Sequence, residues 1–116
     1  MTLARILGYL IVLFFLLAST NGLKKYTSNK LVKKVASNHK LFGMLATITA
    51  FVHLVVNVSN NNLRPFGLIT LLLLLATGAL GASFYKLKNK KLYIAHRILG
   101  PITLLSIIIH VLTNLL

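Results

Sequence analysis

The chain has 116 residues, 57% of them hydrophobic, and carries 13 lysines and arginines but no aspartate, glutamate or cysteine. These counts exclude disulfides, thiolate metal sites, cysteine nucleophiles and every mechanism that needs a carboxylate. The composition is typical of a membrane protein. The unbalanced positive charge needs partners outside the chain. We expect membrane lipid with anionic head groups or an acidic partner protein, and no nucleic acid.

Four apolar segments predict helices of about 20 residues, the length that crosses a bilayer. They are residues 3–22, 38–58, 65–85 and 93–116. We therefore expect an all-α integral membrane protein, with a single transmembrane four-helix domain over residues 1–116. Pro65 lies in the first turn of its helix, where proline is tolerated, and Pro101 should bend the last helix. A cleavable signal peptide is the alternative for the first segment, but that helix has a counterpart later in the chain.

The connections between these segments differ in charge. Residues 23–37 and 86–92 are lysine-rich, whereas residues 59–64 form a short asparagine-rich turn. Eleven of the thirteen basic residues lie in or beside the first and third connections, and only Arg5 and Arg64 lie on the opposite side. The positive-inside rule places the lysine-rich connections in the cytoplasm. We expect a prokaryotic cytoplasmic membrane, with both termini extracytoplasmic.

One motif, H-[KR]-x-x-G-x9-H-x3-N, occurs twice, in residues 39–57 and 96–114. It contains all four histidines of the chain, which are His39, His53, His96 and His110. Fourteen residues separate the two histidines of each copy, so both lie on one helix face, about 21 Å apart along the axis. Two such helices facing each other offer two histidine pairs at two depths. A haem held by one imidazole from each helix fits between them.

The other two helices carry glycine pairs at the same spacing of fourteen residues. These glycines are Gly8 and Gly22 in the first helix and Gly67 and Gly81 in the third. The first helix matches the third at an offset of 59 residues, and the histidine helices match at an offset of 57, which indicates a duplicated helical hairpin. Glycine would allow the edge of a flat porphyrin to come close to the helix. Small-residue helix packing is the alternative explanation.

This pattern resembles the haem-binding half of cytochrome b from quinol-oxidising bc complexes, which has histidine pairs on its second and fourth helices and glycine pairs on its first and third. Ferric-reductase-like transmembrane cytochromes b are similar in their histidine pairs alone. The resemblance covers nearly the whole chain. It implies two haem b groups, one held by His39 and His96 on the cytoplasmic side and one by His53 and His110 on the outer side. The later helices of the bc proteins and their proline–glutamate motif are absent from these 116 residues.

Basic residues lie near each predicted haem level. Lys40 and Arg97 directly follow the inner histidines, and Arg5 and Arg64 lie at the outer level. They could pair with haem propionates, or they could extend into the head-group region as ordinary interfacial charges. Two asparagines lie one turn after the outer histidines and could bond to a neighbouring helix or a propionate, or simply be polar helix ends: Asn57 and Asn114.

The sequence thus predicts a di-haem electron carrier working across the bilayer, between a quinol or cytoplasmic-side donor and an extracytoplasmic acceptor. A redox partner protein, quinone, and a homodimer or larger complex are the expected partners. A quinol-linked ferric reductase acting at a haem edge and a haem-free membrane anchor subunit remain alternatives. A proton channel would be expected to use carboxylates, and the chain has none.

Overall fold

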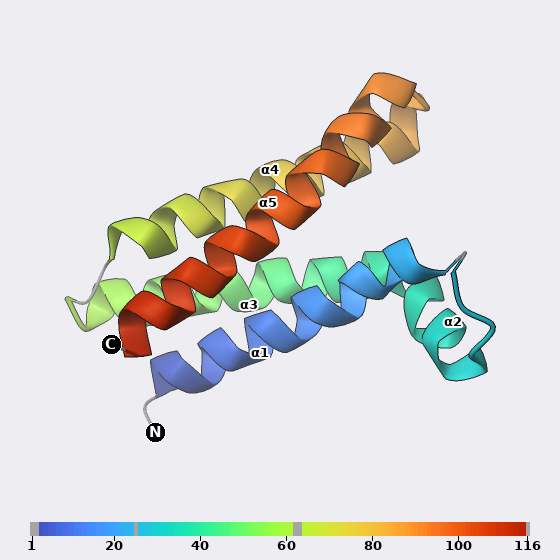
Figure 1. Cartoon of the computed structure of the whole chain (residues 1–116). Helices are drawn as coiled ribbons and strands as arrows, with labels where there is room; N and C mark the ends of the chain where they lie inside the picture. Colours follow the sequence, from blue (N-terminus) through green and yellow to red (C-terminus); the bar gives the residue numbers. More distant parts are fainter. Residues whose placement is uncertain (1–2, 25, 62–63, 116) are drawn as a thin grey trace. The chain divides into compact units, whose positions relative to one another are not determined.

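The computed structural model describes residues 3–24, 26–61 and 64–115, which form helices and turns without a strand (Figure 1). The helices are α1 (Leu3–Ser19), the 3-10 helix η1 (Thr20–Leu23), α2 (Lys30–Ser37), α3 (His39–Ser59), α4 (Pro65–Leu87) and α5 (Lys90–Leu115). The spans formed by α1 with η1, α3, α4 and α5 are each long and apolar enough to cross a membrane. The predicted all-α membrane fold is therefore confirmed.

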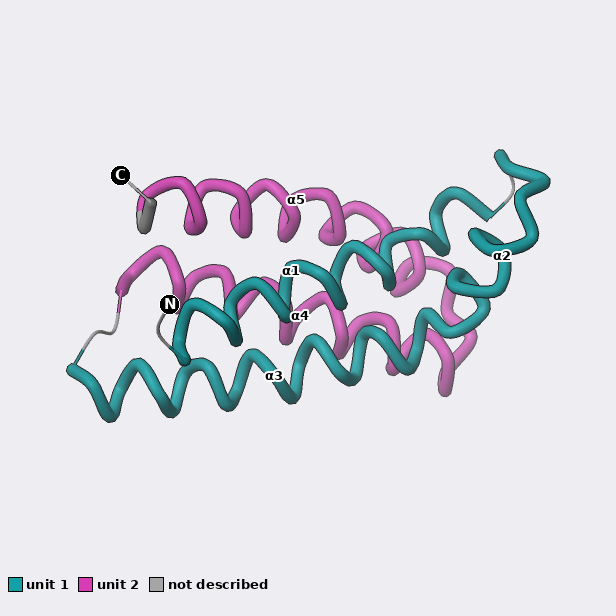
Figure 2. The backbone as a smooth tube through the Cα atoms, turned by 90° about the horizontal axis from the view of Figure 1, so that it is seen from below, with its two compact units in different colours: residues 1–61 teal, residues 62–116 magenta. Residues whose placement is uncertain are grey.

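The chain divides into two compact units, residues 1–61 and residues 62–116 (Figure 2). In the first unit α1 packs along α3, and in the second α4 packs along α5. The two long helices of each unit run in opposite directions (Figure 1). Each unit is therefore a helical hairpin, as the internal repeat of the sequence predicts.

The first connection contains a helix that the sequence analysis missed. Its lysine-rich residues 23–37 were expected to be a polar connection, but α2 occupies the second half of them. The Asn29 side chain caps this helix by accepting hydrogen bonds from the backbone N–H groups of Leu31 and Val32. Ala36 is buried, and α2 packs against η1 and the end of α1. Helix α2 thus has a capping asparagine at its start and a buried alanine near its end.

The third connection is shorter than its lysine-rich sequence suggests. Only Lys88 and Asn89 separate α4 from α5, because both helices extend beyond their apolar segments. Lys88 ends α4 in the left-handed conformation, with φ of 56°. The Asn89 side chain accepts a hydrogen bond from the Lys91 N–H and so begins α5. Helix α5 continues through Pro101, where the sequence predicts a bend.

Most buried side chains of the two hairpins occupy equivalent positions of the repeat. Buried residues of α1 recur 59 positions later in α4, and those of α3 recur 57 positions later in α5. The equivalent pairs are Phe15 and Leu74, Ala18 and Thr77, Ala46 and Thr103, and Ala50 and Ile107. Small residues dominate these positions in the first hairpin, which lets its helices approach closely. The duplication is therefore visible in the packing as well as in the sequence.

Hydroxyl groups distinguish the second hairpin from the first. Thr77 and Thr103 form a buried hydrogen bond of 2.9 Å between α4 and α5, where the first hairpin has two alanines. Thr70 and Ser106 form another, of 2.7 Å. Thr70 can also donate to the Phe66 carbonyl one turn earlier in its own helix. Of Thr77 and Thr103, one donates across to the other, and the one that accepts can donate to the carbonyl one turn earlier. The second hairpin thus adds polar cross-links to the same packing pattern.

The close approach of α1 and α3 predicts a large effect at Ala46, which is 1% exposed. Replacing it in Ala46→Leu forces extra methylene groups between the helices, and we expect a loss of about 1–3 kcal/mol in unfolding free energy. Denaturant titration of the protein in mixed micelles measures it. Met44→Leu, at an exposed position of the same helix, is the control and should change stability little. Equal stability of the two variants would contradict the packing described.

Candidate haem-ligand site

The two inner histidines make the same hydrogen bond in the two hairpins. His39 Nδ1 lies 2.6 Å from the Ala18 carbonyl oxygen, and His96 Nδ1 lies 2.7 Å from the Thr77 carbonyl oxygen. A carbonyl can only accept, so Nδ1 carries the proton in both rings. Since Ala18 and Thr77 are equivalent in the repeat, the contact is duplicated with the hairpin. Each inner imidazole is thereby fixed in orientation and in tautomer, with its lone pair on Nε2.

The predicted glycine positions lie against histidine rings of their own hairpin. A Cβ atom built on Gly8 would lie 3.5 Å from His53 Cε1, and one built on Gly67 would lie 2.9 Å from His110 Cε1. A Cβ on Gly81 would lie 2.9 Å from Cε1 of the inner histidine His96. Side chains at Gly67 and Gly81 would therefore collide with an imidazole. At these three positions a glycine and a histidine lie at the same level of their hairpin, and the predicted approach of a porphyrin to the glycines stays a prediction.

Gly22, the fourth glycine, differs from the other three. It lies in η1, is exposed, and has no atom within 4 Å of the position that its Cβ would take. The α-helix has ended at Ser19, so the backbone no longer follows the path that Gly81 follows in α4. His39 is nevertheless held by the Ala18 carbonyl, four residues before Gly22, as His96 is held by the Thr77 carbonyl, four residues before Gly81.

These carbonyl groups are features of the candidate site that the sequence did not predict. Ala18 and Thr77 each lie four residues before a glycine of the predicted pairs, and Ala4 stands in the same relation to Gly8. The backbone of Ala4 interacts with the His53 ring, although His53 Nδ1 is buried without a hydrogen-bond partner. Every residue has a backbone carbonyl, so the sequence cannot mark the one that accepts a hydrogen bond. The glycines are the indirect signal, because a histidine ring that packs against a glycine can also reach the carbonyl one turn before it.

His53 differs from the inner histidines in what its other nitrogen contacts. The Asn57 side-chain Nδ2 lies 3.1 Å from His53 Nε2, one turn along the same helix. From the sequence, Asn57 is expected to bond to another helix or to a propionate, or to be a polar helix end. In the structure its amide instead contacts Nε2 of His53, a residue predicted to ligate haem. The side chain of Asn114, its equivalent in the repeat, lies outside what the structure describes.

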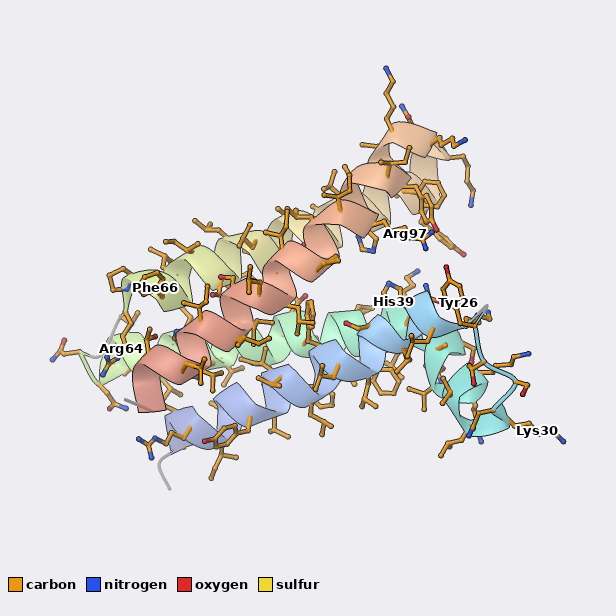
Figure 3. All side chains as sticks on the ribbon, in the orientation of Figure 1. Tyr26, Lys30, His39, Arg64, Phe66 and Arg97 are labelled. Atoms are coloured by element: carbon orange, nitrogen blue, oxygen red, sulfur yellow. The ribbon has the colours of Figure 1, made fainter. Side chains whose placement is uncertain are left out.

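The predicted propionate partners occupy the helix ends. Arg64 immediately precedes α4, and Arg97 lies toward the opposite end of the same hairpin, where its Nη1 donates to the Tyr93 hydroxyl at 3.1 Å (Figure 3). Arg5 and Lys40 are exposed, on the first turns of α1 and α3. His39 lies at the end of the first hairpin that carries α2 (Figure 3). In each hairpin the cations thus bracket the apolar span at both ends.

In the described parts of the chain, no three histidine, cysteine or acidic side chains gather where they could hold a metal ion. The ligand set predicted from the sequence takes one histidine from each hairpin and would not form such a group. It stays a prediction. Comparison with models of protein families, with curated proteins and with solved structures gave no match for this chain.

The contact between Gly81 and His96 predicts that two neighbouring glycine substitutions in α4 differ in their effect on stability. Gly81→Ala must push the His96 ring away and break its hydrogen bond to the Thr77 carbonyl. Gly78→Ala meets nothing within 4 Å and serves as the matched control. Both gain the helix preference of alanine, up to about 1 kcal/mol. We expect Gly81→Ala to be less stable than Gly78→Ala by about 1–3 kcal/mol, measured by denaturant titration. Equal stability would show that the ring does not occupy this space.

Proposed function

We propose that this chain is a b-type membrane cytochrome that binds two haems and carries electrons across the bilayer. His39 and His96 would hold one haem, and His53 and His110 the other, so that each haem takes one imidazole from each hairpin. The observation that supports this most is the repeated hydrogen bond from Nδ1 of an inner histidine to a carbonyl of the neighbouring helix. Histidines that ligate metals commonly donate their second N–H in this way.

The donor set suits an iron porphyrin better than a free metal ion. Iron in a porphyrin needs only axial ligands from the protein, and two imidazoles suffice. The chain contains no carboxylate or thiolate with which to complete a coordination shell around a bare cation. The spans are apolar, as the porphyrin faces are, and basic residues at both ends of each hairpin can neutralise propionates.

The inner histidines are held with Nδ1 toward a carbonyl, so that Nε2 is the nitrogen that would ligate. Because Nδ1 carries the proton, Nε2 can ligate without losing one, and the carbonyl fixes the plane of the ring. The contact with Gly81 restricts the His96 ring further. A bound haem supplies a one-electron couple, and ligation by two imidazoles leaves no open position on the iron, which suits electron transfer rather than substrate binding.

The lysine-rich connections favour an acidic partner or an anionic surface at the cytoplasmic side. Exposed lysines are present both on α2 and at the junction of α4 and α5, and the chain holds no acid to neutralise them. A donor protein with an acidic face would be steered to them. Quinol is the other donor class, and extracytoplasmic redox proteins and ferric iron are the acceptor classes. A membrane potential that is negative inside favours outward electron movement by about 2.3 kcal/mol per 100 mV.

The proposed ligand pairs predict which histidine substitutions act together. After reconstitution with haem, the purified protein should bind two haems per chain, with a reduced b-type spectrum. His39→Ala and His96→Ala should remove the same spectral component, and the double variant should lose no more than either single one. His53→Ala and His110→Ala should remove the other component, and Met44→Leu should remove neither. Spectra and redox titrations measure these losses. A protein without b-type absorption, or with absorption unchanged in all four variants, would overturn the proposal.

Transport across the bilayer requires both haem sites. In vesicles with trapped ferricyanide, an impermeant external reductant should reduce the trapped acceptor only when haem-loaded protein is present. His53→Ala should stop this transfer while the remaining haem is still reduced, because the gap between the sides becomes too long. Absorbance of the trapped ferricyanide follows the reaction, and protein-free vesicles correct for leakage. Unchanged transfer by His53→Ala would argue against a two-haem path. Steady turnover of quinol and a ferric chelate by the isolated chain would favour a reductase instead.

A further inference from the structure

The two histidine levels differ in the residue that lies one helical turn after each histidine. Both inner histidines are followed at this position by a glycine, Gly43 or Gly100. Both outer histidines are followed by an asparagine, Asn57 or Asn114. The difference is the same in both copies of the repeat. It therefore distinguishes the two levels of the membrane rather than the two hairpins, and the function proposed above gives it no role.

At the outer level, the asparagine contacts the nitrogen that is expected to bind iron. Asn57 Nδ2 lies 3.1 Å from His53 Nε2. An amide N–H can only donate, so Nε2 accepts and the ring proton is on Nδ1. His53 Nδ1 is buried and makes no hydrogen bond, although the ring interacts electrostatically with the Ala4 backbone, so the Asn57 contact is the one that selects this tautomer. Asn57 thus occupies the lone pair that a haem iron would need.

We infer that Asn57 sets the tautomer of His53 and caps its ligating nitrogen, so that the outer site takes up haem less readily than the inner site. The inference rests on the proposed function. Binding of iron at Nε2 requires the Asn57 amide to give up its hydrogen bond, but no proton has to leave the ring, because Nδ1 already carries it. An ordinary intramolecular hydrogen bond corresponds to about a 2- to 10-fold change in a binding constant.

This role makes Asn57 a positioning residue that acts through His53. It has two opposing effects on the outer site. Holding His53 in the tautomer with a lone pair on Nε2 prepares the ring as a ligand, whereas the hydrogen bond itself competes with the iron. At the inner level the carbonyls of Ala18 and Thr77 set the tautomer from the Nδ1 side, and the glycine one turn later offers no competing side chain. At limiting haem, the inner site should therefore fill first.

The hydrogen bond can be tested first without haem. In the haem-free protein, nitrogen NMR of labelled histidine should show His53 in the single tautomer with Nδ1 protonated. Asn57→Leu removes the donor at similar side-chain size and should give a mixture of tautomers at His53. Asn60→Leu, three residues further along at an exposed position, is the control and should leave the His53 signals unchanged. A His53 tautomer that does not respond to Asn57→Leu would overturn the inference.

Haem titration then tests the order of loading. In the unaltered protein, the component that His39→Ala removes should appear first, and that removed by His53→Ala second. Asn57→Leu should raise outer-site affinity relative to the inner site by about 2- to 10-fold. Unchanged relative affinities, or an outer site that fills first in the unaltered protein, would overturn the inference. Absence of haem binding by every variant would overturn the proposed function instead, because the tautomer experiment does not depend on haem.

The reciprocal substitution places an amide beside an inner histidine. A Cβ atom at Gly43 would meet nothing within 4 Å, so the hairpin can accept a side chain there. Gly43→Asn should lower inner-site affinity and bring the two loading steps closer together. Gly43→Ala adds a side chain without an amide and is the matched control. If the alanine variant lowers affinity as much as the asparagine variant does, crowding explains the effect and the inference is contradicted.

Discussion

The close contact between a backbone and an imidazole is the interaction on which each hairpin depends. Within a bilayer, lipid competes equally for apolar side chains, so helices associate through tight packing and polar contacts. Here both come from the same side chains. The His96 ring fills the space left open by Gly81 and hydrogen-bonds to the Thr77 carbonyl one turn earlier. The residue that would bind the cofactor is therefore also part of the helix interface, so a substitution of this histidine alters the packing of the hairpin as well as the proposed ligand.

The two hairpins preserve this contact while differing around it. The bonds from His39 to Ala18 and from His96 to Thr77 occupy the same place in the repeat, yet the side chains that carry the two carbonyls differ. In the second hairpin the Thr77 hydroxyl bonds across to Thr103, whereas the first hairpin has alanines at both positions. A backbone acceptor permits this divergence, since any residue supplies the carbonyl. The contact requires space for the imidazole one turn after the carbonyl. Gly81 provides this space in the second hairpin, and the early end of α1 before Gly22 provides it in the first.

Much of this architecture was predictable because it depends on spacing. Long apolar segments fix the spans, and the fourteen-residue separations place Gly8 beside His53 and Gly67 beside His110 once each hairpin folds back. Features that depend on backbone groups or on the local partner of a polar side chain were not predictable. The acceptor carbonyls have no residue type. Helix α2 depends on the Asn29 cap and the contact of Ala36, which a lysine-rich stretch hides. For Asn57 the sequence left open a neighbouring helix, a propionate or no partner at all, and the structure shows that its partner is His53 of the same helix.

The complete lack of acidic residues limits how the site can be tuned. In many metalloproteins a carboxylate accepts the second imidazole N–H and raises the basicity of the ligand. This chain has no such group, and the partners described for its histidines are neutral, namely two carbonyls and one amide. A neutral acceptor stabilises positive charge on the imidazole less than a carboxylate does, and so donates less to a bound iron. Any difference between the two proposed haem levels would then come from how these neutral dipoles are directed. The Asn57 amide beside His53 and the glycine one turn after His39 supply such a difference in the first hairpin.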